Sequence, residues 1–311
     1  MPSLTSIARN PAPDGAQLMS LTTSDAVKLR AVYWPGAMAA KGTVLVLQGR
    51  TECIEKYFET IAELLTRGFG VATFDWRGQG LSDRALSDRH KGHVRDFSEY
   101  LLDLDAFIDQ CVKPNMPPPY TLLAHSMGAH IAVRYLHVTP QLFARAVLCS
   151  PMASINAAPL PHGIARAIAW SGCAFGFSES YIPKGKPYQR DSEPFNNNRL
   201  TGDATRFARN ADILDANPEL AIGSPTLGWL DTAYRSMAVS LDGKFCSAIK
   251  TPTLMVYGGE ERVSLPFYQV LLAARLGNCQ SLCITRARHE ILQETNAIRA
   301  KFWAAFDGFA G

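Results

Sequence analysis

The stretch Leu122-Leu123-Ala124-His125-Ser126-Met127-Gly128 indicates most about how this chain folds. Its first residues are apolar, as in a buried strand, and the residues after the serine continue with the spacing of a helix. A serine between a strand and a helix lies in a sharp turn that exposes its hydroxyl, provided that the residues two before and two after it are small. Ala124 and Gly128 meet that condition. We interpret Ser126 as a candidate nucleophile; the alternative is a serine that only caps a helix.

Short apolar segments alternate with amphipathic helical patterns on both sides of this turn. We expect strands at 17–22, 26–33, 43–47, 70–74, 120–124, 146–149, 253–257 and 280–284, and helices at 54–66, 97–111, 127–137, 266–276 and 291–306. Alternation of this kind predicts an α/β protein with a mainly parallel central sheet and helices on both faces. The first two strands are expected to form an antiparallel edge.

Residues 152–235 interrupt the alternation with frequent Gly, Pro and Asn, and they contain no clear strand. A stretch this long is not expected to be a bare loop in a compact domain. We predict an inserted helical cap over 152–235, a core formed by 16–151 and 236–311, and a loose, proline-containing tail at 1–15. Part of the cap, 164–177, is apolar on nearly all sides, which suits either contact with an acyl chain or packing onto the core.

The composition excludes several classes of protein. The chain has 311 residues, of which 47% are hydrophobic and 19% charged, and its net charge is +3, so neither general disorder nor nucleic-acid binding is expected. No apolar run approaches the ~20 residues that span a bilayer. The seven cysteines show no C-x-x-C or metal-ligand spacing, and 279 and 283 are expected to be buried in a strand rather than bridged. We expect a cytoplasmic protein without metal or cofactor.

Two later segments offer partners for the serine. A loop with two carboxylates, Glu260 and Glu261, follows the strand at 253–257, and His289 follows the strand at 280–284. The carboxyl ends of parallel strands meet at one edge of the sheet, where α/β folds hold their ligands. The chain order serine, acid, histidine is that of α/β-hydrolases. The alternative for His289 is a surface histidine at the start of the last helix.

An acyl-transfer site also needs two backbone N–H groups for the oxyanion. Met127, at the start of the helix after the serine, offers one. The loop Gln48-Gly49-Arg50-Thr51 follows the strand at 43–47, and the amide of Arg50 is our candidate for the second. The alternative for Arg50 is a charged side chain that pairs with Glu52 or Glu55 at the surface.

Several motifs together resemble the α/β-hydrolase fold and, more narrowly, the bacterial lysophospholipase and monoacylglycerol lipase family, over about residues 20–307. The motifs are Asp75-Trp76-Arg77-Gly78-Gln79-Gly80-Leu81-Ser82, Gly92-His93-Val94, His125-Ser126-Met127-Gly128, Thr226-Leu227-Gly228-Trp229, Gly259-Glu260-Glu261-Arg262-Val263 and Ala287-Arg288-His289-Glu290-Ile291-Leu292. The resemblance implies a serine ester hydrolase whose triad acid is Glu261, where the family usually has Asp, with Glu260 as the second candidate. Gln48-Gly49 replaces the usual His-Gly, and Ala124 replaces the first elbow glycine.

We therefore expect a substrate of the lysophospholipid or monoacylglycerol class, with transient contact of the cap with a membrane surface. A small ester, an amide, a lactone or a thioester stays open, as does a catalytically silent binding module, and the oligomeric state is not indicated. Gly78-Gln79-Gly80 lacks the third glycine of a nucleotide-binding loop and is interpreted as a structural turn. Asp75 and Arg77 are expected to form a loop-fixing ion pair, and His90, Lys91 and His93 a solvated or structural loop.

Overall fold

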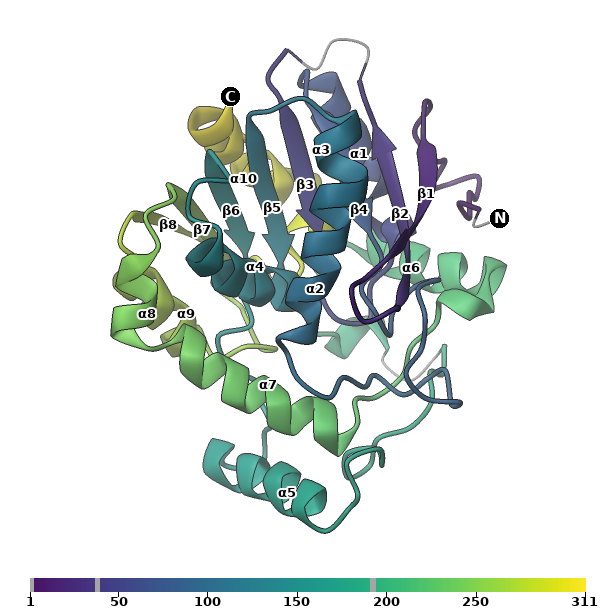
Figure 1. Cartoon of the computed structure of the whole chain (residues 1–311), viewed down its shortest axis with the longest axis vertical. Helices are drawn as coiled ribbons and strands as arrows, with labels where there is room; N and C mark the ends of the chain where they lie inside the picture. The colour runs from purple at the N-terminus through teal and green to yellow at the C-terminus, as the bar shows by residue number, and fades with distance from the viewer. Residues whose placement is uncertain (1–2, 37–39, 191–193) are drawn as a thin grey trace.

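The strands form one sheet through the centre of the molecule (Figure 1). The computed structural model describes residues 3–36, 40–190 and 194–311. In spatial order, the strands of this sheet are β1 (Gln17–Thr22), β2 (Lys28–Trp34), β4 (Gly70–Phe74), β3 (Thr43–Leu47), β5 (Tyr120–His125), β6 (Arg145–Cys149), β7 (Thr253–Gly258) and β8 (Cys279–Ile284). β2 is antiparallel to both β1 and β4, and the other neighbouring pairs are parallel. The predicted α/β class and the antiparallel edge are confirmed.

Side chains of the central strands alternate between two apolar layers. In β3, Val44 and Val46 pack into one layer, whereas Leu45 and Leu47 pack into the other. Successive side chains of a strand point to opposite faces, so a fully apolar strand such as β3 needs cover on both sides. All five of its residues are buried.

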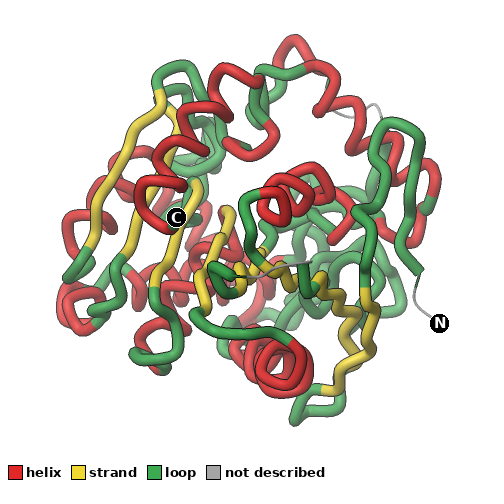
Figure 2. The backbone as a smooth tube through the Cα atoms, turned by 90° about the horizontal axis from the view of Figure 1, so that it is seen from above, coloured by secondary structure: helices red, strands yellow, loops and turns green. Residues whose placement is uncertain are grey.

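Helices supply that cover on both faces, as Figure 2 shows from above. The helices of the core are α1 (Phe58–Thr66), α2 (Glu99–Ala106), α3 (Lys113–Asn115), α4 (Ser126–Val138), α8 (Gly243–Ala248), α9 (Pro266–Arg275) and α10 (Asn296–Ala310). α1 and α10 share one apolar layer, while α2, α4, α8 and α9 contribute to the other. Short helical turns at Ile54–Tyr57 and Ile291–Gln293 lead toward α1 and α10, where the sequence predicts single continuous helices.

Three further helices lie between β6 and β7: α5 (His162–Ala174), α6 (Ala204–Ala216) and α7 (Leu227–Ser240). α5 packs along α7, and its small residues Ala165 and Ala169 are buried. The predicted cap boundary at 235 falls inside α7, which continues to Ser240. Met237 and Ser240 are buried beyond that boundary. The helix is therefore shared between cap and core.

The large apolar side chains of α5 and the turn after it face solvent. The exposed fractions are 50% for Ile164, 63% for Trp170, 79% for Phe175 and 58% for Phe177. These side chains do not pack the cap onto the core, which was one of the two interpretations of 164–177. Within the described ranges, no helix is both long and apolar enough to cross a membrane.

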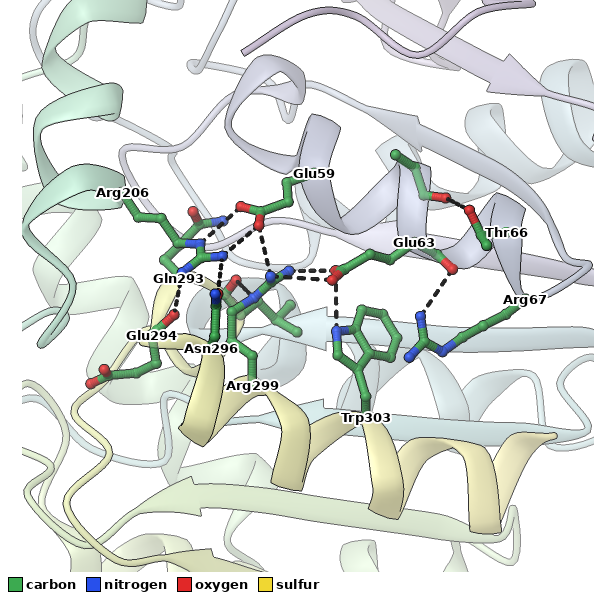
Figure 3. Close-up of polar contacts among 12 residues, drawn as sticks. Glu59, Glu63, Thr66, Arg67, Arg206, Gln293, Glu294, Asn296, Arg299 and Trp303 are labelled. Carbon is green, nitrogen blue, oxygen red and sulfur yellow. Dashed lines mark hydrogen bonds and ion pairs between the residues drawn. The ribbon is translucent and has the colours of Figure 1, made fainter. Parts of the chain in front are cut away.

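An ionic cluster ties α6 to the core (Figure 3). The guanidinium of Arg206 on α6 donates to both carboxylate oxygens of Glu59 on α1, at 2.9 and 2.5 Å. Arg299 on α10 donates to the same carboxylate at 2.8 Å and also to Glu63, which accepts from the indole N–H of Trp303 at 3.1 Å. One carboxylate on α1 thus holds a cap helix and the C-terminal helix together.

The N-terminal segment is held more firmly than the predicted loose tail. The side-chain amide of Asn10 is buried and donates to the backbone carbonyl of Glu55 at 2.9 Å. The backbone carbonyl of Ser3 accepts from Arg30 at 3.0 Å, and Leu4 packs against the apolar layer of α1. Prolines restrict the backbone without preventing such contacts, so composition alone did not indicate them.

The cysteines are unpaired within the described chain. Cys53, Cys111, Cys149 and Cys246 are buried, in agreement with the sequence analysis. The prediction that 279 and 283 are both buried is wrong, because Cys283 is exposed and residue 279 is only half-buried on the edge strand β8.

We predict that Glu59→Gln lowers the free energy of unfolding at neutral pH by about 1–3 kcal/mol, because it leaves several guanidinium groups without their anion. Burial acts to raise the pKa of Glu59, but the hydrogen bond from Arg206 and the charge of Arg299 outweigh it and lower the pKa to about 2. The stabilisation is therefore fully present above the unfolded pKa and disappears as the pH falls from about 4.5 toward 2.

Urea unfolding of the wild type and the variant at a series of pH values measures this difference. Asp109→Asn is the control, because Asp109 pairs with Lys113 where both side chains are more than half exposed, and we expect a change within about 0.5 kcal/mol. A Glu59→Gln effect that stays constant across the acid range would contradict the proposed ionic role.

Candidate active site

Ser126 lies in a strained turn between β5 and α4. Its φ angle is +49°, in the left-handed region that residues with a side chain seldom adopt. Gly128 allows this turn, since a Cβ there would lie 2.4 Å from the backbone carbonyl oxygen of Gln48 and 2.6 Å from that of Leu47. The turn is thus pressed against the end of β3. Ala124 is fully buried, so the first elbow position accommodates a methyl group.

Three strand ends bring the predicted serine, histidine and acid together. Nε2 of His289, which follows β8, lies 2.9 Å from Oγ of Ser126. Nδ1 of the same ring lies 2.7 Å from Oε2 of Glu261, which follows β7. All three side chains are buried. With Nδ1–H donating to the carboxylate, Nε2 is left to accept the hydroxyl proton of Ser126, which is the arrangement that activates a serine.

Glu261, rather than Glu260, is the carboxylate at the imidazole. Its Oε1 accepts from the backbone N–H groups of Val263 at 2.7 Å and Ser264 at 3.2 Å. Burial acts to raise the pKa of Glu261, but the neighbouring His289 and these amide hydrogen bonds outweigh it and lower the pKa. The carboxylate therefore stays ionised. The turn accommodates the side chain of a glutamate, which is longer than that of the aspartate usual in the family. Glu260 is exposed.

The loop that carries Arg50 is held by side chains on either side of the candidate amide. The carboxamide of Gln79 accepts from Thr51 N at 2.8 Å and donates to Gly49 O at 3.0 Å. Gly49 N donates to the carboxylate of Glu52. The backbone flanking Arg50 N is thus fixed, although Gln48 replaces the family's usual histidine. Gln79 was interpreted only as part of a turn, and its contact with this loop could not be read from its spacing.

A buried network under the site connects the same loops. Glu52 accepts from Tyr57 OH at 2.6 Å and from Nζ of Lys56 at 2.9 Å, and it lies 3.2 Å from the ring of His125. Lys56 also pairs with Glu290 at 2.6 Å. Burial acts to raise the pKa of Glu52, but the charge of Lys56 and the contact with His125 hold it well below its usual range. This network was not predicted, because Glu290 lies far from Glu52 and Lys56 in the sequence.

The predicted ion pair of Asp75 and Arg77 is wrong, and the alternative ion pair of Arg50 is not formed among the described residues. Arg50 pairs with neither Glu52 nor Glu55, because Glu52 is bound to Lys56 and Glu55 to Arg30 at 2.7 Å. Asp75 and Arg77 do not pair with each other.

Asp75 instead pairs with Arg30 at 2.6 Å, and Arg77 with Asp103 at 2.7 Å. Each charge of the predicted pair has its own partner in another element, so both remain structural, as expected. His93 is also structural: it is buried, and its Nδ1 lies 2.8 Å from Oγ1 of Thr226.

Ser126 and His289 line a cavity of about 720 Å³, and residues from 152–235 form part of its wall. Met152, Ile155, Leu160, Ile168 and Leu230 contribute apolar lining, and Arg50 and Lys186 contribute positive charge. The amide of Met127 lies at the N-terminus of α4, where backbone dipoles favour negative charge. The described residues contain no cluster of His, Cys, Asp and Glu suited to a metal ion.

Comparison with known proteins identifies the family of the chain. The family model described as serine aminopeptidase, S33, matches residues 38–296. Lysophospholipase L2 of Escherichia coli K12 is 34% identical over 265 residues, which cover 83% of this chain and 76% of that protein. The probable lysophospholipase L2 of Haemophilus influenzae is 30% identical over 262 residues, covering 84% and 81%.

Solved structures show the same fold at lower identity. A soluble variant of the monoglyceride lipase of Saccharomyces cerevisiae aligns with a TM-score of 0.75 at 17% identity, covering 95% of both chains. The monoacylglycerol lipase of Paleococcus ferrophilus aligns with a TM-score of 0.70 at 19% identity, covering 91% of this chain and 98% of that one. This chain belongs to the serine aminopeptidase S33 family of α/β-hydrolases and is a serine ester hydrolase.

Proposed function

We propose that the protein hydrolyses single-chain lipid esters, of the lysophospholipid or monoacylglycerol class, with Ser126, His289 and Glu261 as its catalytic triad. The observation that carries the proposal is the position of the His289 ring, within hydrogen-bond distance of Ser126 on one side and Glu261 on the other. Apolar side chains such as Leu160 and Ile168 in the wall of the cavity support a lipid substrate.

In this mechanism, Nε2 of His289 takes the hydroxyl proton while Oγ of Ser126 attacks the ester carbonyl carbon. The carbonyl oxygen becomes an oxyanion that accepts hydrogen bonds from the amides of Arg50 and Met127. His289 then gives its proton to the leaving alcohol, and an acyl-enzyme remains. Water repeats the sequence to release the fatty acid. Glu261 holds the ring in the required tautomer and stabilises its positive charge.

The cavity supports a lipid rather than a small ester. A volume of about 720 Å³ far exceeds what an acetyl ester fills, and cap residues such as Leu160 and Ile168 add apolar lining. The curated relatives that match most of the chain are named lysophospholipases. Both observations favour a substrate with one long acyl chain.

An aminopeptidase, which the family description names, is less well supported. Such an enzyme must bind the free amino group of its substrate, for which an unpaired carboxylate is the natural partner. Among the described residues that line the cavity, the carboxylates are Glu52 and Glu290. Both form ion pairs with Lys56, at 2.9 and 2.6 Å, so neither is available for a substrate cation.

The exposed apolar side chains of α5 and of the turn after it support transient contact with a membrane surface. Trp170, Phe175 and Phe177 lie on the cap that covers the cavity, and aromatic side chains are favoured at membrane interfaces. We propose that this face docks while a lipid leaves the bilayer for the cavity. The unpaired cysteines suit a reducing compartment such as the cytoplasm.

We predict that Ser126→Ala lowers kcat for a monoacylglycerol by several orders of magnitude, because no other hydroxyl is poised to attack. The melting temperature should not fall, because the substitution removes only the hydroxyl oxygen and leaves the backbone of the turn unchanged. Titrated release of fatty acid measures the rate, and thermal unfolding checks the fold. Activity that survives the substitution would contradict the proposed mechanism.

The acid is tested by a matched pair of substitutions. Glu261→Gln should lower kcat by roughly 10³- to 10⁴-fold, because the amide neither stabilises the imidazolium nor favours the correct tautomer. Glu260→Gln changes an exposed neighbour and should leave kcat within about twofold. Equal effects of the two variants, or a larger effect at 260, would reject the assignment.

The lipid assignment predicts that kcat/KM for p-nitrophenyl esters rises from acetate to dodecanoate, because the longer chains bury more apolar surface in the cavity. A preference for acetate would favour the small-ester alternative. Trp170→Ser extends the test to the cap surface. It should slow hydrolysis of a lipid presented in anionic vesicles and leave hydrolysis of dissolved p-nitrophenyl butyrate unchanged; equal rates in both assays would argue against docking through α5.

A further inference from the structure

The charged residues that line the cavity give it a positive balance. The acids among the described lining residues, Glu52 and Glu290, are neutralised by Lys56, which lies outside the lining. The cations that line the same cavity include Arg50 and Lys186. The cavity that holds the serine therefore presents positive charge to a ligand.

The guanidinium of Arg50 has a fixed position in the wall of the cavity that Ser126 also lines. Its Nη2 donates to the backbone carbonyl of Gly223 at 2.7 Å, and its Cζ lies 5.2 Å from the centre of the Trp229 ring. Gly92 leaves room for it, because a Cβ at that position would lie 2.7 Å from Nη2. The orientation of this side chain is thus set by the protein before a ligand arrives.

Two sequence motifs with no part in the triad fix that position. Gly92 and Thr226 are joined by a hydrogen bond from Thr226 N to Gly92 O at 2.9 Å, and His93 contacts the Thr226 hydroxyl. Thr226 Oγ1 accepts from the N–H of Trp229, whose indole N–H donates to Tyr100 OH at 3.1 Å. The Gly92-His93-Val94 and Thr226-Leu227-Gly228-Trp229 motifs therefore hold an arginine in the substrate cavity.

The charge of Arg50 is not compensated within the described chain. No described carboxylate forms an ion pair with it, and its Nε is buried without a hydrogen-bond partner among the described residues. Burial lowers the pKa of Arg50 to about 10, which still leaves the side chain cationic at neutral pH. A buried cation without an anion is costly, so an anionic group on the ligand would be bound here with advantage.

We propose that the side chain of Arg50 binds the phosphate of a lysophospholipid head group while its own backbone amide binds the oxyanion of the same substrate. This deepens the proposed function and rests on it. A guanidinium presents paired donors that match phosphate oxygens. From the amide nitrogen of Arg50 to its Cζ there are as many covalent bonds as from the ester carbonyl carbon of a 1-acyl lysophospholipid to its phosphorus, so one residue can reach both groups.

Lys186 adds a second cation near this position. Its backbone N–H donates to Oγ of Ser224, and its carbonyl accepts from the N–H of Ser224 at 3.0 Å. Ser224 directly follows Gly223, the acceptor of Arg50. The Lys186 side chain is exposed at the cavity, where it would meet the outer part of a head group as a mobile point charge.

The experiment compares two substrates with the same acyl chain, a 1-acyl lysophosphatidylethanolamine and the corresponding monoacylglycerol. The measured quantity is the ratio of their kcat/KM values, since effects on the oxyanion loop that both substrates share cancel in it. The wild type should favour the phospholipid. Arg50→Gln should lower the ratio by roughly 10- to 100-fold, the range expected for hydrogen bonds to a charged group, and Arg50→Lys should restore part of it.

A second variant displaces the guanidinium without changing residue 50. Gly92→Ala adds a methyl group where Nη2 lies and should lower the same ratio. Lys184→Gln is the control, because Lys184 is an exposed cation outside the cavity lining and its loss should not change the ratio. In the wild type, sn-glycerol 3-phosphate should compete with monoacylglycerol hydrolysis, and Arg50→Gln should raise its inhibition constant at least tenfold.

Different results overturn different claims. If the wild type hydrolyses both substrates and Arg50→Gln leaves the ratio unchanged, the phosphate assignment is wrong and the proposed function stands. The phosphate assignment is also wrong if the wild type prefers the monoacylglycerol and inorganic phosphate inhibits its hydrolysis as strongly as glycerol phosphate does. The cations would then bind free phosphate rather than a head group. If the wild type hydrolyses neither lipid, the proposed function fails and the assignment fails with it.

Discussion

The position of one imidazole ring is the constraint on which the proposed chemistry depends. His289 must reach Ser126 and Glu261 at once. His289 follows β8, Glu261 follows the neighbouring strand β7, and Ser126 follows β5, which β6 separates from β7. Only a parallel arrangement brings all three strand ends to the same edge. The apolar strands and the helices on both faces therefore fix the relative positions of three loops, so that the three side chains lie within hydrogen-bond distance.

Buried charge completes what the sheet begins. Glu52 accepts a hydrogen bond from the backbone of Gly49 and contacts His125, the residue before the serine, and Lys56 links Glu52 to Glu290, the residue after His289. The loop of Gly49 and Arg50, the turn at Ser126 and the loop of His289 thus share one network. Removing one member would leave a buried charge unpaired, which generally costs more than the pair contributes. Such a network suits a site whose geometry must not drift.

Features with a local cause were predictable from the sequence. Strands such as Thr43–Leu47 are continuous apolar runs, and the elbow around Ser126 depends on the small neighbours Ala124 and Gly128. The ion pairs were not predictable in this way. Arg50 lies close in sequence to Glu52 and Glu55, yet those acids bind Lys56 and Arg30, and the guanidinium turns toward Gly223, far along the chain. Partner choice among charges is decided by tertiary packing, which spacing does not encode.

The central claim is that the hydroxyl of Ser126 is activated by His289. Covalent labelling tests it most directly: the protein is treated with an alkyl fluorophosphonate, digested, and the modified peptide is identified by mass spectrometry. We expect one adduct, on Ser126, whose formation stops when His289 is replaced by alanine. A protein that cleaves esters while Ser126 stays unmodified, or that is labelled equally fast without the imidazole, would contradict it.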